Sequence, residues 1–253
     1  MNDNYLDLTP DNLAHEHVCC AIGDKKHQHG VACKKAWLAE RLPAGHVFRK
    51  LDAQGKVFIE FAPLKTAWAS VEGENYLYIY CLWVAGSFKE QGHGARLLQY
   101  AIEAAKQQHR SGICIIGAKK KKPFLADKKF LQKYGFSVVD SAGDYELLAL
   151  SFHGEPPRFS AAAKVMRIEE KELTIYHSPQ CPFIANCVEQ VEKYCATKAI
   201  PLRLIAVQSR EQALRIPGVF NNWATFLHRE YQGTHLLNEG QLKKLLCSFS
   251  CEL

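Results

Sequence analysis

The chain has 253 residues, 47% of them hydrophobic, and is therefore long enough for two domains with packed cores. No apolar run approaches the roughly 20 residues that span a bilayer, and the first ten residues lack the pattern of a secretory signal. We therefore expect a cytoplasmic protein with no membrane partner. The net charge of +6 suits an anionic ligand, and without a recognised binding motif a nucleic-acid partner is not expected.

The cysteines and histidines near the N-terminus do not predict a metal site. Ten cysteines in a chain with no visible signal favour reduced thiols over disulfides. Cys19 and Cys20 are adjacent, so in a strand they would face opposite sides. His29 and Cys33 are spaced to share one helix face, but a pair of ligands does not close a site. We therefore predict no bound metal.

The first part of the chain alternates between strand and helix patterns. A short apolar run at residues 17–22 predicts the first strand. Asp24 then supplies a helix N-cap, and a mixed apolar face predicts a helix to about Leu42. Two alternating runs at residues 46–51 and 56–61, joined by a glycine-containing turn, predict an antiparallel hairpin.

The segment that follows carries the main functional signal. Residues 76–84 form a nearly unbroken apolar run typical of a buried strand, and helical periodicity starts near Leu97. Between them lie Gly92 and Gly94, where the backbone can approach a ligand and the helix N-terminus favours a phosphate. A P-loop is excluded because no Gly-Lys-Ser/Thr follows, and a dinucleotide motif would need a glycine where Leu97 stands. Two interpretations of this loop remain: it binds the diphosphate of an acyl-CoA, or its glycines serve only a tight turn.

The rest of this part predicts a strand at 112–118, a helix with Asp127 near its start, and strands at 136–139 and 145–152. A long hydrophobic strand, a basic-x-x-Gly-x-Gly loop and an amphipathic helix, in this element order, resemble the GNAT family of N-acetyltransferases. The aromatic-rich run from Phe130 into Gly135-Phe136 is also similar to that family. The resemblance covers residues 5–152 and implies an α/β fold with a mixed, mostly antiparallel sheet flanked by helices.

The GNAT resemblance implies an enzyme that moves an acetyl group from acetyl-CoA, its co-substrate, to an amine acceptor. It places the pantetheine arm beside a splayed sheet at the end of the long strand, and the diphosphate at the glycine loop. The implied cofactor-binding residues are Leu82, Trp83, Val84, Lys89, Gln91, Gly92, His93, Gly94 and Ala95. Lys89 stands where the family usually has Arg or Gln. A basic cluster at 119–122, with Lys128 and Lys129, is either a phosphate or acidic-acceptor site or a solvated loop.

The catalytic groups are less clearly marked than the cofactor site. Transfer from a thioester needs a base for the amine proton and an acid for the leaving thiolate. Glu60, Glu72 and Tyr80 are candidate bases. The family often has a tyrosine acid where Leu131 stands here, so either water serves as the acid or Tyr134 substitutes. The acceptor, a small-molecule or peptide amine, stays open, and so does assembly as a homodimer.

A polar, proline-containing segment at residues 153–168 predicts a linker to a second domain at 169–253. There, strand patterns at 173–176, 201–206 and 223–228 accompany a helix opened by Cys181-Pro182-Phe183 and a terminal helix. This arrangement resembles the thioredoxin and glutaredoxin fold, and the two-part layout resembles acetyltransferases with a YoaP-type C-terminal domain.

Cys181 is the candidate reactive thiol of this second domain. A cysteine at a helix N-terminus has its thiolate stabilised by the helix dipole. Ile184 occupies the position of the second cysteine of a Cys-x-x-Cys motif, so a monothiol or a docking role fits better than a disulfide oxidoreductase. The alternative function is therefore a thiol or soft-metal binding or redox relay protein whose GNAT fold does not catalyse.

Overall fold

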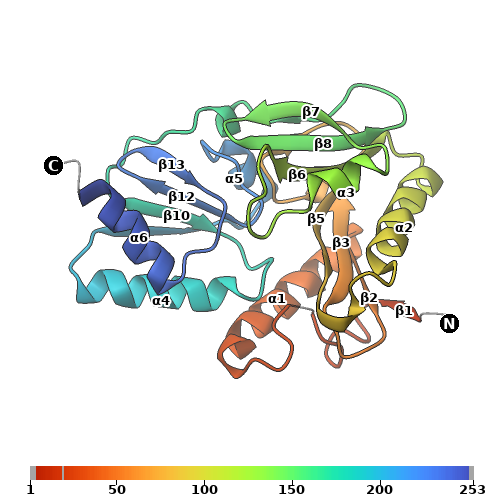
Figure 1. Cartoon of the computed structure of the whole chain (residues 1–253), viewed down its shortest axis with the longest axis horizontal. Helices are drawn as coiled ribbons and strands as arrows, with labels where there is room; N and C mark the ends of the chain where they lie inside the picture. The colour runs from red at the N-terminus through yellow and green to blue at the C-terminus, as the bar shows by residue number, and fades with distance from the viewer. Residues whose placement is uncertain (1–3, 19, 251–253) are drawn as a thin grey trace.

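The computed structural model describes residues 4–18 and 20–250, so Cys19 and both chain ends lie outside the described residues. Two sheets pack side by side, one in the N-terminal region (residues 4–152) and one in the C-terminal region (residues 169–250) (Figure 1). Within the described residues, no helix combines the length and the apolar content needed to cross a membrane.

The larger sheet has seven strands, and only one neighbouring pair runs parallel, β5 with β6. Its strands in spatial order are β1 (Tyr5–Asp7), β2 (Val47–Leu51), β3 (Val57–Pro63), β5 (Tyr76–Val84), β6 (Gly112–Ala118), β8 (Tyr145–Ser151) and β7 (Ser137–Ala142). The predicted mixed, mostly antiparallel sheet is confirmed, and the predicted β5 and β6 match residue for residue.

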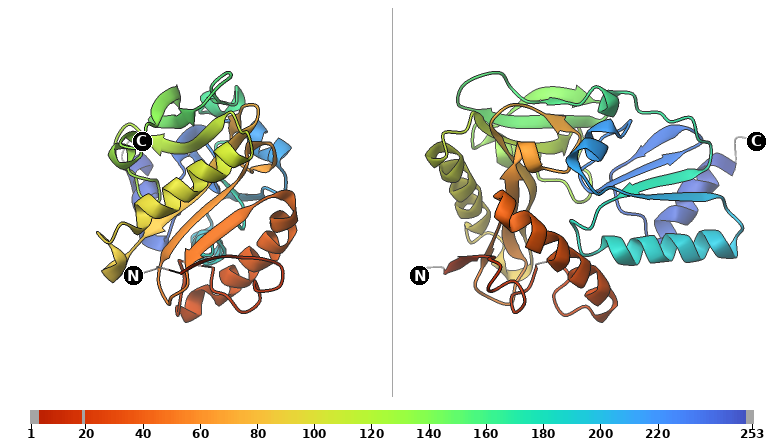
Figure 2. Two further views of the ribbon diagram at one scale, coloured as in Figure 1. Left: turned by 90° about the vertical axis from the view of Figure 1, so that its right-hand side faces the viewer. Right: turned by 180° about the vertical axis from the view of Figure 1, so that it is seen from behind.

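Helices cover both faces of this sheet. On one face α2 (His93–Gln107) and α3 (Lys128–Gln132) pack apolar side chains such as Leu98 and Leu131 against Ile59 and Ile79. On the other face lies α1 (Gln28–Arg41), which follows a short 3-10 turn capped by the Asp24 side chain (Figure 2). The helix expected after Asp24 is therefore confirmed, and so is the helix expected after the glycine loop.

Two irregularities in β5 shape the centre of the sheet. Glu60 of β3 pairs with Cys81 while Phe61 pairs with Ile79, so Tyr80 is the extra residue of a β-bulge. The bulge shifts the alternation of β5, which puts both Tyr80 and Cys81 on the α1 face. In addition, β5 pairs with β6 only as far as Ile79, and beyond that point the two strands part. The splayed sheet implied by the family resemblance is present.

The prediction of a strand at residues 17–22 is wrong. The described residues of that segment form turns, and the first strand is β1, which pairs with β2 through Tyr5 and Leu51. The apolar side chains are still buried, since Val18 is only 2% exposed. The His17 ring contacts the Ala53 carbonyl at 2.9 Å. Side-chain contacts of this kind, and not the backbone hydrogen bonds of a β-sheet, hold the segment in place.

The C-terminal sheet has the strand order β11-β10-β12-β13, with β10 and β11 parallel and the other pairs antiparallel. Its strands are β10 (Leu173–His177), β11 (Leu202–Ala206), β12 (Trp223–Leu227) and β13 (Glu230–Gly233), of which β13 was not predicted. The helices are α4 (Ile184–Thr197), α5 (Arg210–Arg215) and α6 (Glu239–Ser250). Side chains of α4 and α6 bury one face of the sheet.

The other face of the C-terminal sheet packs against the N-terminal region. Phe220 and Phe226 belong to the same hydrophobic cluster as Phe58 and Tyr78. Backbone contacts join the regions as well, because the amide of Ser70 donates to the Phe220 carbonyl at 3.0 Å. The two regions therefore share one continuous core.

The segment 153–168, expected as a linker, is partly ordered against this core. It contains β9 (Arg158–Phe159), which pairs with β4 (Val71–Glu72), and a 3-10 turn at Ala162–Lys164. Phe159 is 1% exposed. The polar composition of the segment did not reveal these few buried anchors.

The contact between α1 and the loop before α4 gives a first prediction. A Cβ on Gly30 would overlap the carbonyl oxygen of Pro182. Alanine normally favours a helix by about 1 kcal/mol over glycine. We nevertheless expect Gly30→Ala to lower the free energy of unfolding by about 1–3 kcal/mol, since neither backbone can yield without moving the two regions apart. Urea unfolding measures this.

The matched control is Gly240→Ala in α6, where a new Cβ would meet only the Asn238 side chain at 3.5 Å. This variant should be neutral or slightly more stable than the wild type. If Gly30→Ala is also neutral, the close approach of α1 to Pro182 is not a constraint on the fold.

Candidate active site

A cavity of about 270 Å³ lies where the C-terminal region meets the α1 face of the large sheet, and we call it the interface pocket. From the N-terminal region it is lined by Cys20, Lys34, Lys56, Phe58, Glu60, Tyr80, Cys81, Trp83 and Phe124. From the C-terminal region it is lined by Gln180, Cys181, Pro182, Phe183, Asn221, Asn222, Thr234 and Leu236. Neither region forms this pocket alone.

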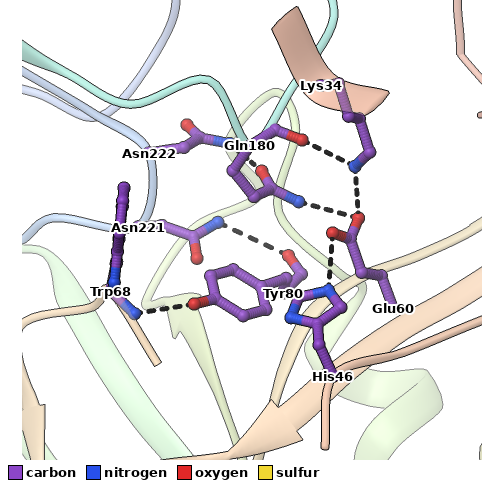
Figure 3. A network of polar contacts seen from close by, with 8 residues as sticks. All are labelled: Lys34, His46, Glu60, Trp68, Tyr80, Gln180, Asn221 and Asn222. Atoms are coloured by element: carbon purple, nitrogen blue, oxygen red, sulfur yellow. Dashed lines mark hydrogen bonds and ion pairs between the residues drawn. The ribbon is translucent and has the colours of Figure 1, made fainter. Parts of the chain in front are cut away.

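Glu60 is the polar centre of the pocket and is fully buried. Its Oε2 atom accepts hydrogen bonds from Lys34 Nζ at 2.6 Å and from Gln180 Nε2 at 2.8 Å, and its Oε1 atom lies 2.9 Å from His46 Nε2 (Figure 3). Lys34 also donates to the Gln180 carbonyl at 2.6 Å. Asn222 extends the network by donating to Gln180 Oε1 at 2.7 Å. This network joins α1, β3 and the loop before α4.

The charges in this network follow from burial and pairing. Burial acts to raise the pKa of Glu60, but the Lys34 ammonium and the hydrogen bonds from His46 and Lys34 outweigh it and hold that pKa below its ordinary value. Burial lowers the pKa of His46, against the opposing pull of Glu60, so the ring is neutral at pH 7. Because a carboxylate only accepts, the Nε2 atom of His46 carries the hydrogen.

Tyr80 lies beside Glu60 but its hydroxyl is already committed. It accepts a hydrogen bond from the Trp68 amide at 2.6 Å (Figure 3). Burial raises the pKa of Tyr80, which opposes deprotonation and therefore a role as base. The Tyr80 ring forms a wall of the interface pocket, and this is the function that its position supports.

The glycine loop has the exposure expected for a ligand site. Gly92 is exposed, adopts a left-handed conformation at φ +79° and forms the N-cap of α2, with no side chain capping the helix. Gln91 is exposed, and Gly94 and Ala95 are half-buried. His93 is only 2% exposed and its Nδ1 atom lies 2.7 Å from the Tyr5 hydroxyl, so its side chain anchors the loop. Lys89 is exposed.

The end of β5 lies between this loop and the interface pocket. Leu82, Trp83 and Val84 pair with β3 on one edge, and their other edge is not paired with β6. A small cavity of about 20 Å³ in the splay is lined by Leu82 and Trp83, and also by Phe124 and Asn221. Phe124 is 52% exposed and, at φ +65°, adopts a conformation that is uncommon for a large side chain. It lines both this cavity and the interface pocket.

The remaining catalytic candidates lie elsewhere. Tyr134 packs its ring against Phe130 at 5.1 Å, within the cluster on the α2 face of the sheet. Leu131, in the position of the family's tyrosine, is fully buried. Glu72 lies in β4 and pairs with Arg158 at 3.4 Å. None of the three lines the interface pocket.

Cys181 does not have the properties expected of a reactive thiol. The helix α4 begins at Ile184, three residues after Cys181, so the thiol is not at the first helical position. Burial raises the pKa of Cys181 to about 12, the opposite of the predicted stabilisation of its thiolate. Burial also raises the pKa of Cys81 on the facing wall, and neighbouring thiols and Glu60 add to the effect. These protonated thiols count against a redox relay.

The basic cluster surrounds a cavity of about 320 Å³ at the end of β6, lined by residues 118–122 and 125–129. Two of its lysines are paired, Lys122 with Asp144 at 3.3 Å and Lys128 with Glu146 at 2.6 Å. Elsewhere, the His29 ring and the Cys33 thiol lie 3.7 Å apart. Within residues 4–18 and 20–250, no group of three metal-ligating side chains is arranged around one point.

A sheet that opens beside an uncapped helix N-terminus, with a buried carboxylate across the open strand, defines an acyltransferase of the GNAT type. Residues 11–136 match the family model described as the acetyltransferase (GNAT) family, and residues 201–244 match the one described as YoaP-like. The chain is 36% identical to the "Uncharacterized N-acetyltransferase YoaP" of Bacillus subtilis strain 168, over 96% of this chain and 98% of that protein. The chain therefore belongs to the GNAT acetyltransferase family and carries a YoaP-like C-terminal segment.

Solved structures of other proteins are also similar to part of the chain. One is a GNAT family acetyltransferase from Brucella melitensis in complex with acetyl-CoA, with 13% identity, a TM-score of 0.41, and coverage of 62% of this chain and 92% of that one. Another is Ard1 from Thermoplasma volcanium, with 12% identity, a TM-score of 0.42, and coverage of 61% and 100%. The predicted enzyme class, an acetyl-CoA-dependent acyltransferase, is confirmed by the family of the chain.

Sequence reasoning found Glu60 but missed its partners. Lys34 lies on the apolar face of α1, where a lysine between buried positions such as Gly30 and Leu38 was a usable signal. His46, at the start of the hairpin, and Gln180, beside Cys181, gave no such signal. Their role depends on contacts between segments far apart in the chain.

The network predicts how stability depends on pH. The folded protein resists protonation of His46, so below pH 6.5 the unfolded chain binds a proton that the folded chain does not. Glu60 acts in the same direction below about pH 4.5. The free energy of unfolding should therefore fall on acidification, by up to about 1.4 kcal/mol per pH unit for each group. Urea unfolding between pH 7.5 and 5 measures the decline.

His46→Asn should make this decline shallower, whereas His109→Asn, a change at an exposed turn position, should keep the wild-type decline. The variants are needed because burial also lowers the pKa of His17, His27, His177 and His235. If the free energy of unfolding falls equally steeply with pH in the wild type and in His46→Asn, the neutral, buried state of His46 is contradicted.

Proposed function

We propose that the protein transfers the acetyl group of acetyl-CoA to an amine bound in the interface pocket. One observation carries the proposal: the splayed end of β5 has the open N-terminus of α2 on one side and the Glu60 pocket on the other. A thioester that follows this strand from the loop would arrive beside the pocket.

The donor's diphosphate would bind at the start of α2. The first amides of a helix have no partner within it, and the helix dipole adds a partial positive charge. Gln91, Gly92, His93, Gly94 and Ala95 would provide these backbone N–H groups, and Lys89 would add a full charge. The exposure of Gly92 and the buried anchor of His93 support this arrangement.

The pantetheine arm would hydrogen-bond to the unpaired edge of Leu82, Trp83 and Val84. The cavity in the splay has space for about one water molecule, and Phe124 lies across it. Entry of the arm therefore requires the Phe124 side chain to swing outward. Its high exposure and its strained backbone support such a movement.

In the transfer step, the amine nitrogen would attack the acetyl carbon and form the N–C bond while the C–S bond breaks. The ammonium-like intermediate would lose its proton to the Glu60 carboxylate, which is ionised at neutral pH. The coenzyme A thiolate would leave and take a proton from solvent. Tyr80 would shape the pocket in this scheme, and Tyr134 would take no part in it.

The C-terminal region would have a thioredoxin-like arrangement used for structure. The parallel β10–α4–β11 unit followed by antiparallel β12 and β13 and then α6 supports it. Ile184 at the second position of the motif and the raised pKa of Cys181 support a role without redox chemistry.

Gly94→Asp tests the donor site. The new Cβ would have ordinary contacts, the nearest at 3.6 Å from Phe130, and an aspartate in the first turn suits a helix. Its charge would repel a diphosphate. We expect the Kd for acetyl-CoA to rise at least tenfold, about 1.4 kcal/mol, with no loss of stability. Titration calorimetry measures the Kd.

Gly94→Asn is the isosteric control and should bind acetyl-CoA several-fold more tightly than Gly94→Asp. Equal affinity of the two variants, both near the wild type, would place the diphosphate elsewhere.

Glu60→Gln tests the proposed base. We expect kcat to fall by about 10²–10⁴-fold because the proton acceptor is lost, while the Kd for acetyl-CoA stays within about threefold because the proposed donor site does not include Glu60. Lys34→Gln breaks the same buried pair but keeps the carboxylate, and it should retain kcat within about tenfold. Steady-state kinetics with thermal unfolding of both variants separates the two effects. An equal loss of kcat in both would show that Glu60 only supports the structure.

A further inference from the structure

The C-terminal region is a fixed wall of the acceptor pocket. Tyr78 donates to Asn221 Oδ1 at 2.6 Å. The Asn221 amide donates to the Tyr80 carbonyl at 3.4 Å (Figure 3). Together with the link from Gln180 to Glu60 and the shared core, these contacts hold the two regions in one arrangement. The pocket therefore has a defined size.

That size limits the acceptor. About 270 Å³ is at the small end of ligand pockets, and the acetyl group must share this space. Gln180, Asn222 and Leu236 form the wall on the C-terminal side. A small amine therefore fits this space better than a long chain does.

The lining also limits the chemistry of the acceptor. Five aromatic side chains face the pocket, Phe58, Tyr80, Trp83, Phe124 and Phe183, which suits an apolar body. Among the described lining residues Glu60 is the single carboxylate, and Lys34 balances its charge. Lys56 is half-buried on the same lining, and within the described part of the chain its side chain forms no ion pair or hydrogen bond. The pocket therefore has one positive charge in excess.

From this charge, the aromatic walls and the small volume, we propose that the acceptor is a small apolar α-amino acid or a close analogue. Its amine faces Glu60, its side chain lies against the aromatic wall, and its carboxylate pairs with Lys56. The excess positive charge disfavours a polyamine. This inference rests on the proposed acetyltransferase function and gives the substrate class of that site.

The test compares four probes on the full chain: L-phenylalanine, L-phenylalaninamide, the peptide Phe-Gly-Gly and spermidine. The amide differs from the acid only in lacking the carboxylate charge. Product formation is followed by mass spectrometry, because the thiols of the protein would interfere with a thiol reagent. We expect kcat/KM for phenylalanine to exceed that for the other three probes by at least tenfold.

Two variants test which residues cause the preference for phenylalanine. Lys56→Gln should reduce the acid-to-amide ratio of kcat/KM to below about threefold. Phe183→Ala, in the C-terminal wall, should raise the KM for phenylalanine about tenfold while kcat and the KM for acetyl-CoA stay within about twofold. A general loss of structure would change all of these values together.

Each other outcome overturns the inference. Preference for the peptide or spermidine, or no acetylation of any probe by a protein that binds acetyl-CoA, would refute the amino-acid class and leave the donor site standing. An acid-to-amide ratio that Lys56→Gln does not change would remove the role of Lys56 and with it the charge argument on which the inference rests. Failure to bind acetyl-CoA in calorimetry would reject the proposed function itself.

Discussion

The buried ion pair between Lys34 and Glu60 is the interaction on which the arrangement of the molecule depends. Removing a carboxylate and an ammonium from water costs several kcal/mol for each ion, so the pair is stable only if its other hydrogen bonds are made. Gln180 and His46 make them, and Gln180 comes from the C-terminal region. The ion pair belongs to the N-terminal region, but the C-terminal region cannot move away without removing the two hydrogen bonds that Gln180 makes with it.

The strand β5 explains how one element can serve both substrates. Its bulge at Tyr80 turns two consecutive side chains toward the α1 face, where the interface pocket lies. Its departure from β6 after Ile79 frees a backbone edge toward the loop of Gly92. A regular strand would keep this edge paired and would place Tyr80 and Cys81 on opposite faces. The two irregularities of one strand therefore bring the proposed donor edge and the wall of the proposed acceptor pocket together.

The sequence predicted those features that depend on neighbouring residues. Periodicity located β5, β6 and α2, and the glycine loop between β5 and α2 located the helix N-terminus. It failed at residues 17–22, where apolar side chains are buried from turns, because burial alone does not distinguish a strand from an anchored loop. It also missed the partners of Glu60. Lys34 and Gln180 are 146 positions apart, and no local pattern reports a contact of that range.

The properties of the Cys181 thiol likewise depend on long-range contacts that the neighbouring residues do not predict. Locally, a cysteine before a proline and a helix predicts an acidic thiol. In the folded chain this loop packs on α1, with the Pro182 carbonyl against Gly30 and the neighbouring Gln180 bonded to Glu60. Burial at that contact outweighs any effect of the helix dipole and keeps the thiol protonated. Cys181 thus lines the interface pocket instead of presenting a reactive thiol. If this pocket binds the acceptor as proposed, the C-terminal region is joined to the acetyltransferase because it completes the acceptor site.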